Sequence, residues 1–122
     1  MATDSARILV IDDEAVLRGL LRDMLSACGY VADVAEDGAA GLARFQTQRY
    51  DAVITDLVMP GMNGFEVAAA LRTLDPAVRI ILLTGSAPSL TSAQARESGV
   101  TLLHKPIALR DLKAAVDAAC GS

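Results

Sequence analysis

Short apolar runs alternate with longer amphipathic stretches along the chain, and this alternation restricts the possible folds more than any other feature of the sequence. Five runs are typical of strands, at residues 7–11, 31–35, 52–55, 79–84 and 100–104. Strands that alternate with helices form a parallel sheet with helices on its faces. The runs around Ile8, Val53 and Ile81 are almost continuously apolar, as in strands buried on both faces, whereas residues 31–34 are mixed and indicate an edge strand. We therefore predict an α/β fold built on a parallel sheet.

Helical spacing follows each apolar run. The first helix ends before Gly29 and carries an apolar stripe at three-and-four spacing, formed by Leu17, Leu20, Leu21, Met24, Leu25 and Cys28. The third helix begins near Asn63, with Glu66 as the partner of a capping box, and ends before Pro76. The other helices are expected at about residues 37–47, 90–98 and 109–119. Residues 90–98 include few large apolar side chains, so we expect this helix to dock most weakly and to move.

The composition describes one soluble domain. With 122 residues, 52% of them hydrophobic, the chain is long enough for one core, and no linker or repeat divides residues 1–122. A net charge of −4 with two Tyr, two Phe and no Trp argues against direct nucleic-acid binding. No apolar run approaches the ~20 residues that span a bilayer, and no targeting segment is recognisable. Because Cys28 and Cys120 are too few for a disulfide framework, we predict a cytoplasmic protein with reduced thiols and no membrane contact.

Functional side chains follow several predicted strands at the point where each strand ends. Asp12 and Asp13 follow the first run, Asp56 follows the third, Thr84 ends the fourth and Lys105 follows the last. The carboxyl ends of parallel strands share one rim of the sheet, so these side chains converge. Each acid taken alone also fits a helix cap or a turn, but the combination with a lysine favours a functional site.

The convergent set suits phosphoryl transfer to an aspartate. Neighbouring carboxylates repel unless a cation lies between them, and Mg²⁺ prefers such oxygen ligands. A carboxylate attacks phosphorus to form an acyl phosphate, and Asp56 is the best nucleophile because it stands alone at its strand end. Lys105 and the metal ion neutralise charge on the phosphoryl oxygens, and Thr84 adds a hydroxyl hydrogen bond.

The sequence resembles the receiver domains of two-component response regulators over essentially the whole chain. The segments that carry the resemblance are Ile11-Asp12-Asp13-Glu14, residues 55–64, Leu83-Thr84-Gly85 and Lys105-Pro106. The resemblance implies a single doubly wound, flavodoxin-like domain with five parallel strands in the order 2-1-3-4-5 and five helices. It also implies a Mg²⁺ site formed by Asp13, Asp56, the main-chain carbonyl of Val58 and, through water, Asp12.

The same resemblance implies a phosphoacceptor switch rather than an enzyme. Asp56 would receive a phosphoryl group from a histidine kinase or a histidine phosphotransfer domain, and Thr84 and Lys105 would bind that group. The surface of the fourth helix, the fifth strand and the fifth helix would then change its packing. A cis peptide bond between Lys105 and Pro106 is expected on the same grounds.

Some positions depart from the family pattern, and several alternatives stay open. Leu102 and Ile107 stand where receivers usually carry aromatic residues, so the familiar aromatic switch at Leu102 is in doubt. A Mg²⁺-dependent phosphohydrolase of similar topology is one alternative, although residues 57–59 lack the second acid that such enzymes usually need. A scaffold that works without phosphate is another. A free-standing regulator and the receiver of a hybrid histidine kinase both fit the chain.

Smaller features are compatible with two interpretations each. His104 is structural or faces a partner, because strand alternation turns it away from the face of Lys105. Ala15 and Val16 lie off the stripe of the first helix, which fits a docking patch for the phosphodonor and incidental exposure equally well.

Overall fold

The computed structural model describes residues 6–85, 97 and 99–121. In this part of the chain, five parallel strands form one sheet in the order β2-β1-β3-β4-β5. The strands are β1 (Arg7–Ile11), β2 (Val31–Ala35), β3 (Ala52–Asp56), β4 (Arg79–Thr84) and β5 (Thr101–His104). The helices are α1 (Ala15–Ala27), α2 (Gly38–Phe45), α3 (Gly64–Leu74) and α5 (Leu109–Ala119). The predicted fold class, strand order and edge position of β2 are confirmed; the helix predicted at residues 90–98 lies outside the described residues, apart from Glu97.

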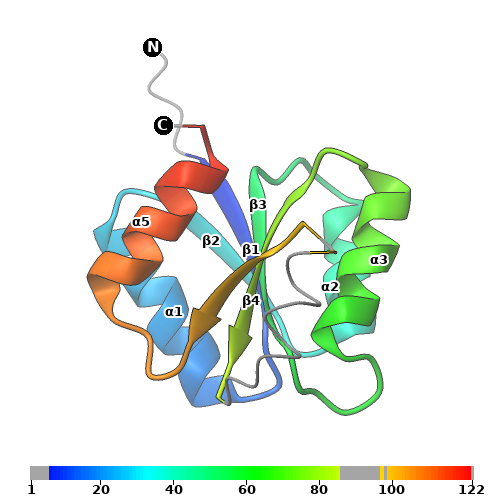
Figure 1. The fold of residues 1–122 in the computed structure, drawn as a ribbon, viewed down its shortest axis with the longest axis horizontal. Helices are drawn as coiled ribbons and strands as arrows, with labels where there is room; N and C mark the ends of the chain where they lie inside the picture. The colour runs from blue at the N-terminus through cyan, green and yellow to red at the C-terminus, as the bar shows by residue number, and fades with distance from the viewer. Residues whose placement is uncertain (1–5, 86–96, 98, 122) are drawn as a thin grey trace.

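Helices cover both faces of the sheet, with α1 and α5 on one face and α2 and α3 on the other (Figure 1). The residues of β1 alternate between the two resulting cores. Ile8 and Val10 pack on the side of α1 and α5, whereas Leu9 and Ile11 pack on the side of α2 and α3. All four side chains are fully buried. This is the arrangement that the continuous apolar run of β1 predicts.

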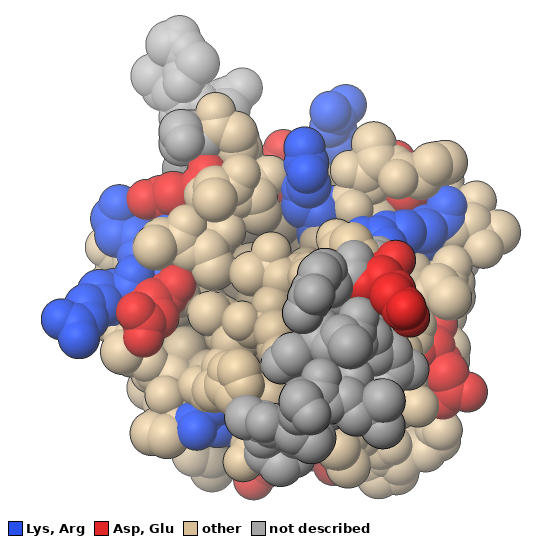
Figure 2. Space-filling model, viewed as in Figure 1, with Lys and Arg blue, Asp and Glu red and all other residues tan. Residues whose placement is uncertain are grey.

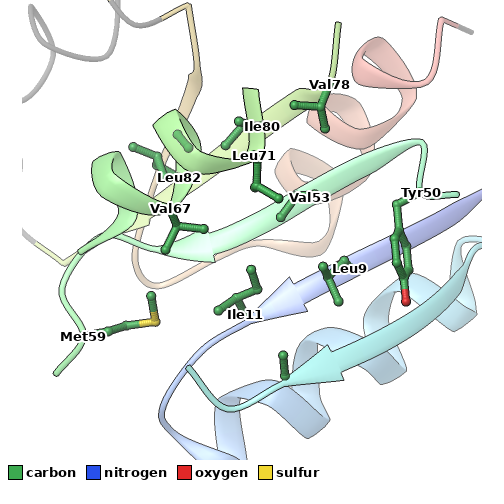
Figure 3. Packing of buried hydrophobic residues seen from close by; sticks show 12 residues of the cluster. Leu9, Ile11, Tyr50, Val53, Met59, Val67, Leu71, Val78, Ile80 and Leu82 are labelled. Atoms are coloured by element: carbon green, nitrogen blue, oxygen red, sulfur yellow. The ribbon is translucent and has the colours of Figure 1, made fainter. Parts of the chain in front are cut away.

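Helix α3 is attached to the sheet through its apolar face. Val67 and Leu71 point toward Val53, Ile80 and Leu82, which lie on β3 and β4 (Figure 3). Each fully buried aliphatic side chain of this kind contributes about 1.5–3 kcal/mol to folding. These contacts hold α3 against β3 and β4.

The first turn of α3 is fixed by the predicted capping box. The Asn63 side chain accepts a hydrogen bond from the amide of Glu66 at 2.9 Å, and the Glu66 carboxylate accepts from the amide of Asn63 at 2.8 Å. These bonds satisfy two amides that the helix itself leaves without acceptors. They also define where the loop between β3 and α3 ends.

The register of the sheet aligns the carboxyl ends of its strands. Asp56 pairs with Leu83, and Thr84 pairs with His104. The amide of Lys105 donates to the carbonyl of Thr84 at 2.8 Å, which extends this alignment by one residue. The arrowheads of β4 and β5 point to the same rim of the molecule (Figure 1). Side chains at the strand ends thus meet at one edge of the sheet, as predicted.

The predicted stripe of α1 is correct except at Leu20. Leu21 and Leu25 are fully buried, whereas the Leu20 side chain is 52% exposed. Adjacent residues of a helix point about 100° apart, so Leu20 and Leu21 cannot both lie at the centre of the face that packs on the sheet. Periodicity alone does not decide which of two neighbouring leucines is buried, and packing of α1 on the sheet selects Leu21.

Charges of both signs are interspersed on the molecular face shown in Figure 2, and the described residues form no continuous basic band on it. None of the described helices has the length and apolar character needed to cross a bilayer.

Candidate metal and phosphoryl site

Three carboxylates meet at the rim formed by the ends of β1 and β3. Asp12, Asp13 and Asp56 each offer one oxygen, and these oxygens all lie within 4.8 Å of one another. Asp12 is fully buried and Asp56 is 6% exposed, whereas Asp13 faces solvent. The structure therefore brings together the three acids that the sequence placed at the strand ends. Two of them sit on the protein side of the cluster and one on the open side.

Asp12 is the acid with an unsatisfied oxygen. Its Oδ1 accepts a hydrogen bond from the amide of Glu14 at 2.8 Å. Its Oδ2 is buried and has no hydrogen-bond partner within the described part of the chain. Burial raises the pKa of Asp12, the hydrogen bond from Glu14 opposes this shift, and the negative charge of Asp56 adds to it. A buried, unpaired carboxylate oxygen beside two other acids is the environment that a divalent cation stabilises.

Asp56 lies opposite a lysine. The Lys105 Nζ is 3.2 Å from Asp56 Oδ2, and the lysine side chain is 26% exposed. Lys105 is held at its main chain by the bond to the Thr84 carbonyl, and its peptide bond to Pro106 is cis, as expected. The ammonium group thus contacts Asp56 from the side of β5, while Asp12 and Asp13 approach from β1.

Thr84 is 1% exposed at the end of β4, next to β3 in the sheet. The main chain leaves the sheet one residue after Asp56. The amide of Leu57 donates the last bond of this strand to the carbonyl of Leu83 at 2.8 Å, and the amide of Gly64 donates to the carbonyl of Leu57 at 2.8 Å, which closes the loop. Val58 lies in the loop between these two bonds, with 75% of its side chain exposed.

Gly64 lets α3 approach the acidic site closely. A Cβ atom at this position would lie 2.8 Å from the carbonyl oxygen of Asp56 and 2.9 Å from the Cα of Leu57. Both are main-chain atoms that cannot move aside without displacing the end of β3 that carries Asp56. The absence of a side chain at Gly64 is therefore a condition for the observed position of Asp56.

One contact at the site escaped the sequence prediction. The Arg18 Nη1 donates a hydrogen bond to the main-chain carbonyl of Asp12 at 2.7 Å. The only sequence signal is an arginine in the second turn of the helix that follows the acids, and the sequence does not say where its guanidinium points. His104, which was predicted to point away from the face of Lys105, is exposed.

Comparisons with known proteins agree on one family. The family model described as "Response regulator receiver domain" matches residues 8–117. The chain is 37% identical over 111 residues to the transcriptional regulatory protein ResD of Bacillus subtilis, covering 90% of this chain and 46% of ResD. It is 38% identical over 107 residues to the sensor protein EvgS of Escherichia coli, covering 87% of this chain and 9% of EvgS. The chain thus spans about half the length of ResD and a small part of EvgS.

Solved structures show the same similarity. A response regulator receiver domain from Clostridium thermocellum has a TM-score of 0.89 and 30% identity, with 94% of each chain covered. The chemotaxis protein CheY4 of Vibrio cholerae has a TM-score of 0.89 and 29% identity, with 95% of this chain and 99% of CheY4 covered.

Proposed function

Because this chain belongs to the response regulator receiver family of two-component signal transduction, we propose that Asp56 is its phosphoacceptor. Receiver domains are signalling switches rather than classical enzymes, and they take phosphoryl groups from histidine kinases. The observation that carries the proposal is the position of Asp56, which lies between Lys105 and the two acids that follow β1. We expect the chain to catalyse at most its own phosphorylation from small phosphodonors and its own dephosphorylation.

In the proposed reaction, a carboxylate oxygen of Asp56 attacks the phosphorus of a phosphohistidine. The new O–P bond forms as the P–N bond breaks, and the imidazole nitrogen keeps the electron pair of that bond. The product is an aspartyl phosphate on this chain and a free histidine on the donor. The sheet and the capped start of α3 hold Asp56 in place, so little reorganisation is needed before attack.

Lys105 and Thr84 would bind the transferred phosphoryl group. Phosphoryl transfer depends on neutralising charge more than on moving protons. The ammonium of Lys105 already contacts Asp56 at 3.2 Å, so a short movement carries it to a phosphoryl oxygen. Thr84 lies at the end of the neighbouring strand, where its hydroxyl would donate a hydrogen bond to another of these oxygens.

We propose that Mg²⁺ is held by Asp12, Asp13, Asp56 and the main-chain carbonyl of Val58. Two observations support this ligand set. Oδ2 of Asp12 is buried without a partner, and one carboxylate oxygen from each of the three acids lies within 4.8 Å of the others. When bound, Mg²⁺ supplies positive charge that stabilises the phosphoryl oxygens. Asp12 also accepts the amide of Glu14, so one of its oxygens is committed to the protein and the other is left for the ion or its water.

The partner is proposed to be a histidine kinase or a histidine phosphotransfer domain that docks beside α1. Val16 is 86% exposed and Leu20 is 52% exposed, and their spacing of four residues places them on one face of the helix next to the acids. This apolar face supports the docking interpretation of Val16 over incidental exposure. The partner-binding role is consistent with a receiver in a separate regulator or in a hybrid kinase.

We also propose that the described domain works in the cytoplasm as one receiver unit. Cys28 and Cys120 are free thiols, which fits a reducing compartment. Phosphorylation would change the packing around β5 and α5. Residue 102 is a leucine, so the proposed change involves no aromatic rotation at this position, and Leu102 packs against the core on the side of α2 and α3.

The test is incubation with acetyl phosphate and Mg²⁺, followed by intact mass spectrometry. We expect one added phosphoryl group per wild-type chain and none on Asp56→Asn. Asp23→Asn is the matched control, because it makes the same change at an exposed acid of α1. A phosphoryl group on the Asp56→Asn variant would show that the nucleophile is another residue.

Two further measurements separate the alternative functions. Repeated turnover of an added phosphomonoester would favour a phosphohydrolase, whereas a single stoichiometric event supports a receiver. Failure of the wild type to bind Mg²⁺ in a titration would favour a scaffold that works without phosphate.

A further inference from the structure

We infer that Arg18 is a positioning residue for the acidic site. Its guanidinium holds the main-chain carbonyl of Asp12, and this contact sets the placement of the carboxylates of Asp12 and Asp13 toward a cation. The inference rests on the proposed function, because it concerns the same Mg²⁺ site.

The carbonyl of Asp12 needs a donor that the sheet does not supply. The amide of Asp12 donates to the carbonyl of Ala35 at 3.1 Å, which continues the pairing of β1 with β2. In a parallel ladder, the carbonyl of Asp12 would next accept from the amide of Asp37. However, β2 ends at Ala35, and Asp37 serves instead as the N-cap of α2. Arg18 takes the place of the missing strand donor at 2.7 Å.

Holding this carbonyl constrains both acids. The carbonyl of Asp12 and the amide of Asp13 belong to one rigid peptide plane, so fixing the oxygen also fixes the origin of the Asp13 side chain. Asp12 is then restrained at its amide, at its carbonyl and at Oδ1, which accepts from Glu14. The remaining oxygen, Oδ2, is the buried and unpaired one. Arg18 therefore completes a set of restraints that leaves one oxygen available to a cation.

Arg18 acts through the main chain and not as a counter-ion. No ion pair within the described part of the chain includes Arg18, and its guanidinium donates to a neutral carbonyl. Removal of Arg18 would change the Mg²⁺ affinity in opposite directions, depending on whether the arginine acts as a charge or as a positioning residue. A cation near a cation site weakens binding by repulsion, so removal of a mere charge would tighten Mg²⁺ binding. Removal of a positioning residue would weaken it.

The test compares Mg²⁺ affinities of three variants with wild type by isothermal titration calorimetry. Arg18→Met keeps the apolar stem and a good helix former but removes the donors. We expect its dissociation constant to rise about tenfold, as when outer-shell partners of metal ligands are removed. Arg18→Lys retains a donor and is expected to recover part of the loss. Arg22→Met makes the same change at an exposed residue one turn further along α1 and is expected to stay within about twofold of wild type.

A second readout does not depend on the metal ion. In metal-free ¹H–¹⁵N spectra, the amides of Asp13 and Glu14 are expected to shift in Arg18→Met and not in Arg22→Met. An Arg18→Met variant that binds Mg²⁺ as tightly as wild type, or more tightly, would overturn the inference. Failure of the wild type to bind Mg²⁺, or unchanged binding by Asp13→Asn, would instead overturn the proposed function, so the two failures are distinguishable.

Discussion

Gly64→Ala is predicted to destabilise the protein because α3 begins in contact with the main chain of β3. The new Cβ would lie 2.8 Å from the Asp56 carbonyl oxygen, 2.9 Å from the Leu57 Cα and 2.9 Å from the Leu82 Cδ2. The leucine methyl has some freedom to rotate away, but the two main-chain atoms do not. The first turn of α3 must therefore move outward against its capping box and its buried apolar face.

Overpacking of this kind costs about 1–3 kcal/mol. Alanine is the better helix former by up to about 1 kcal/mol, but a first helical position gains only part of this. We expect the free energy of unfolding to fall by about 1–2.5 kcal/mol, which corresponds to a melting temperature lower by roughly 4–10 °C for a domain of this size. Phosphorylation of Asp56 should also slow, since its own carbonyl is one of the atoms displaced.

Gly19→Ala is the matched control for this prediction. Gly19 lies inside α1, and a Cβ built there meets nothing within 4 Å. The same substitution is therefore expected to stabilise the protein by about 0.5–1 kcal/mol. Urea unfolding followed by far-ultraviolet circular dichroism measures both variants. If Gly64→Ala proved as stable as wild type while Gly19→Ala behaved as expected, the argument from close approach would be wrong.

Three further predictions follow from the burial and charge of single residues. Burial raises the pKa of Asp12, so the folded chain binds this proton more tightly than the unfolded chain, and the stability of the metal-free protein falls as pH rises above the ordinary value of 3.8. Asp12→Asn should therefore stabilise the metal-free protein in urea unfolding at neutral pH and lose this advantage near about pH 3; equal stability at neutral pH would contradict the assignment. Leu21→Ala should cost about 2–5 kcal/mol because Leu21 is fully buried, whereas Leu20→Ala, at a half-exposed position, should cost less than about 1 kcal/mol in the same assay. Mg²⁺ at one hundred times its dissociation constant should raise the free energy of unfolding of the wild type by about 2.7 kcal/mol, which is measured as a higher melting temperature. Asp13→Asn should lose most of that gain, and an undiminished gain would exclude Asp13 as a ligand.

The sequence was sufficient to predict the described strands and helices and the gathering of side chains at the site. Strands and helices differ in apolar periodicity, and this local property identified β1, β3, α1 and α3 from neighbouring residues alone. The convergence of Asp12, Asp56 and Lys105 also followed, because parallel strands place their carboxyl ends on one rim whatever their exact packing.

The tertiary structure decided the relations that depend on how each element is rotated and how closely it docks. Leu20 and Leu21 fit the stripe of α1 equally well, and only contact with the sheet buries one and exposes the other. Likewise, the hydrogen bond from Arg18 to Asp12 depends on how α1 is oriented relative to the end of β1. The close approach of α3 at Gly64 depends on how closely this helix packs against the end of β3. Periodicity records which face of an element is apolar, but contact distances are set by the packing of all elements together, so these features were accessible only from the folded chain.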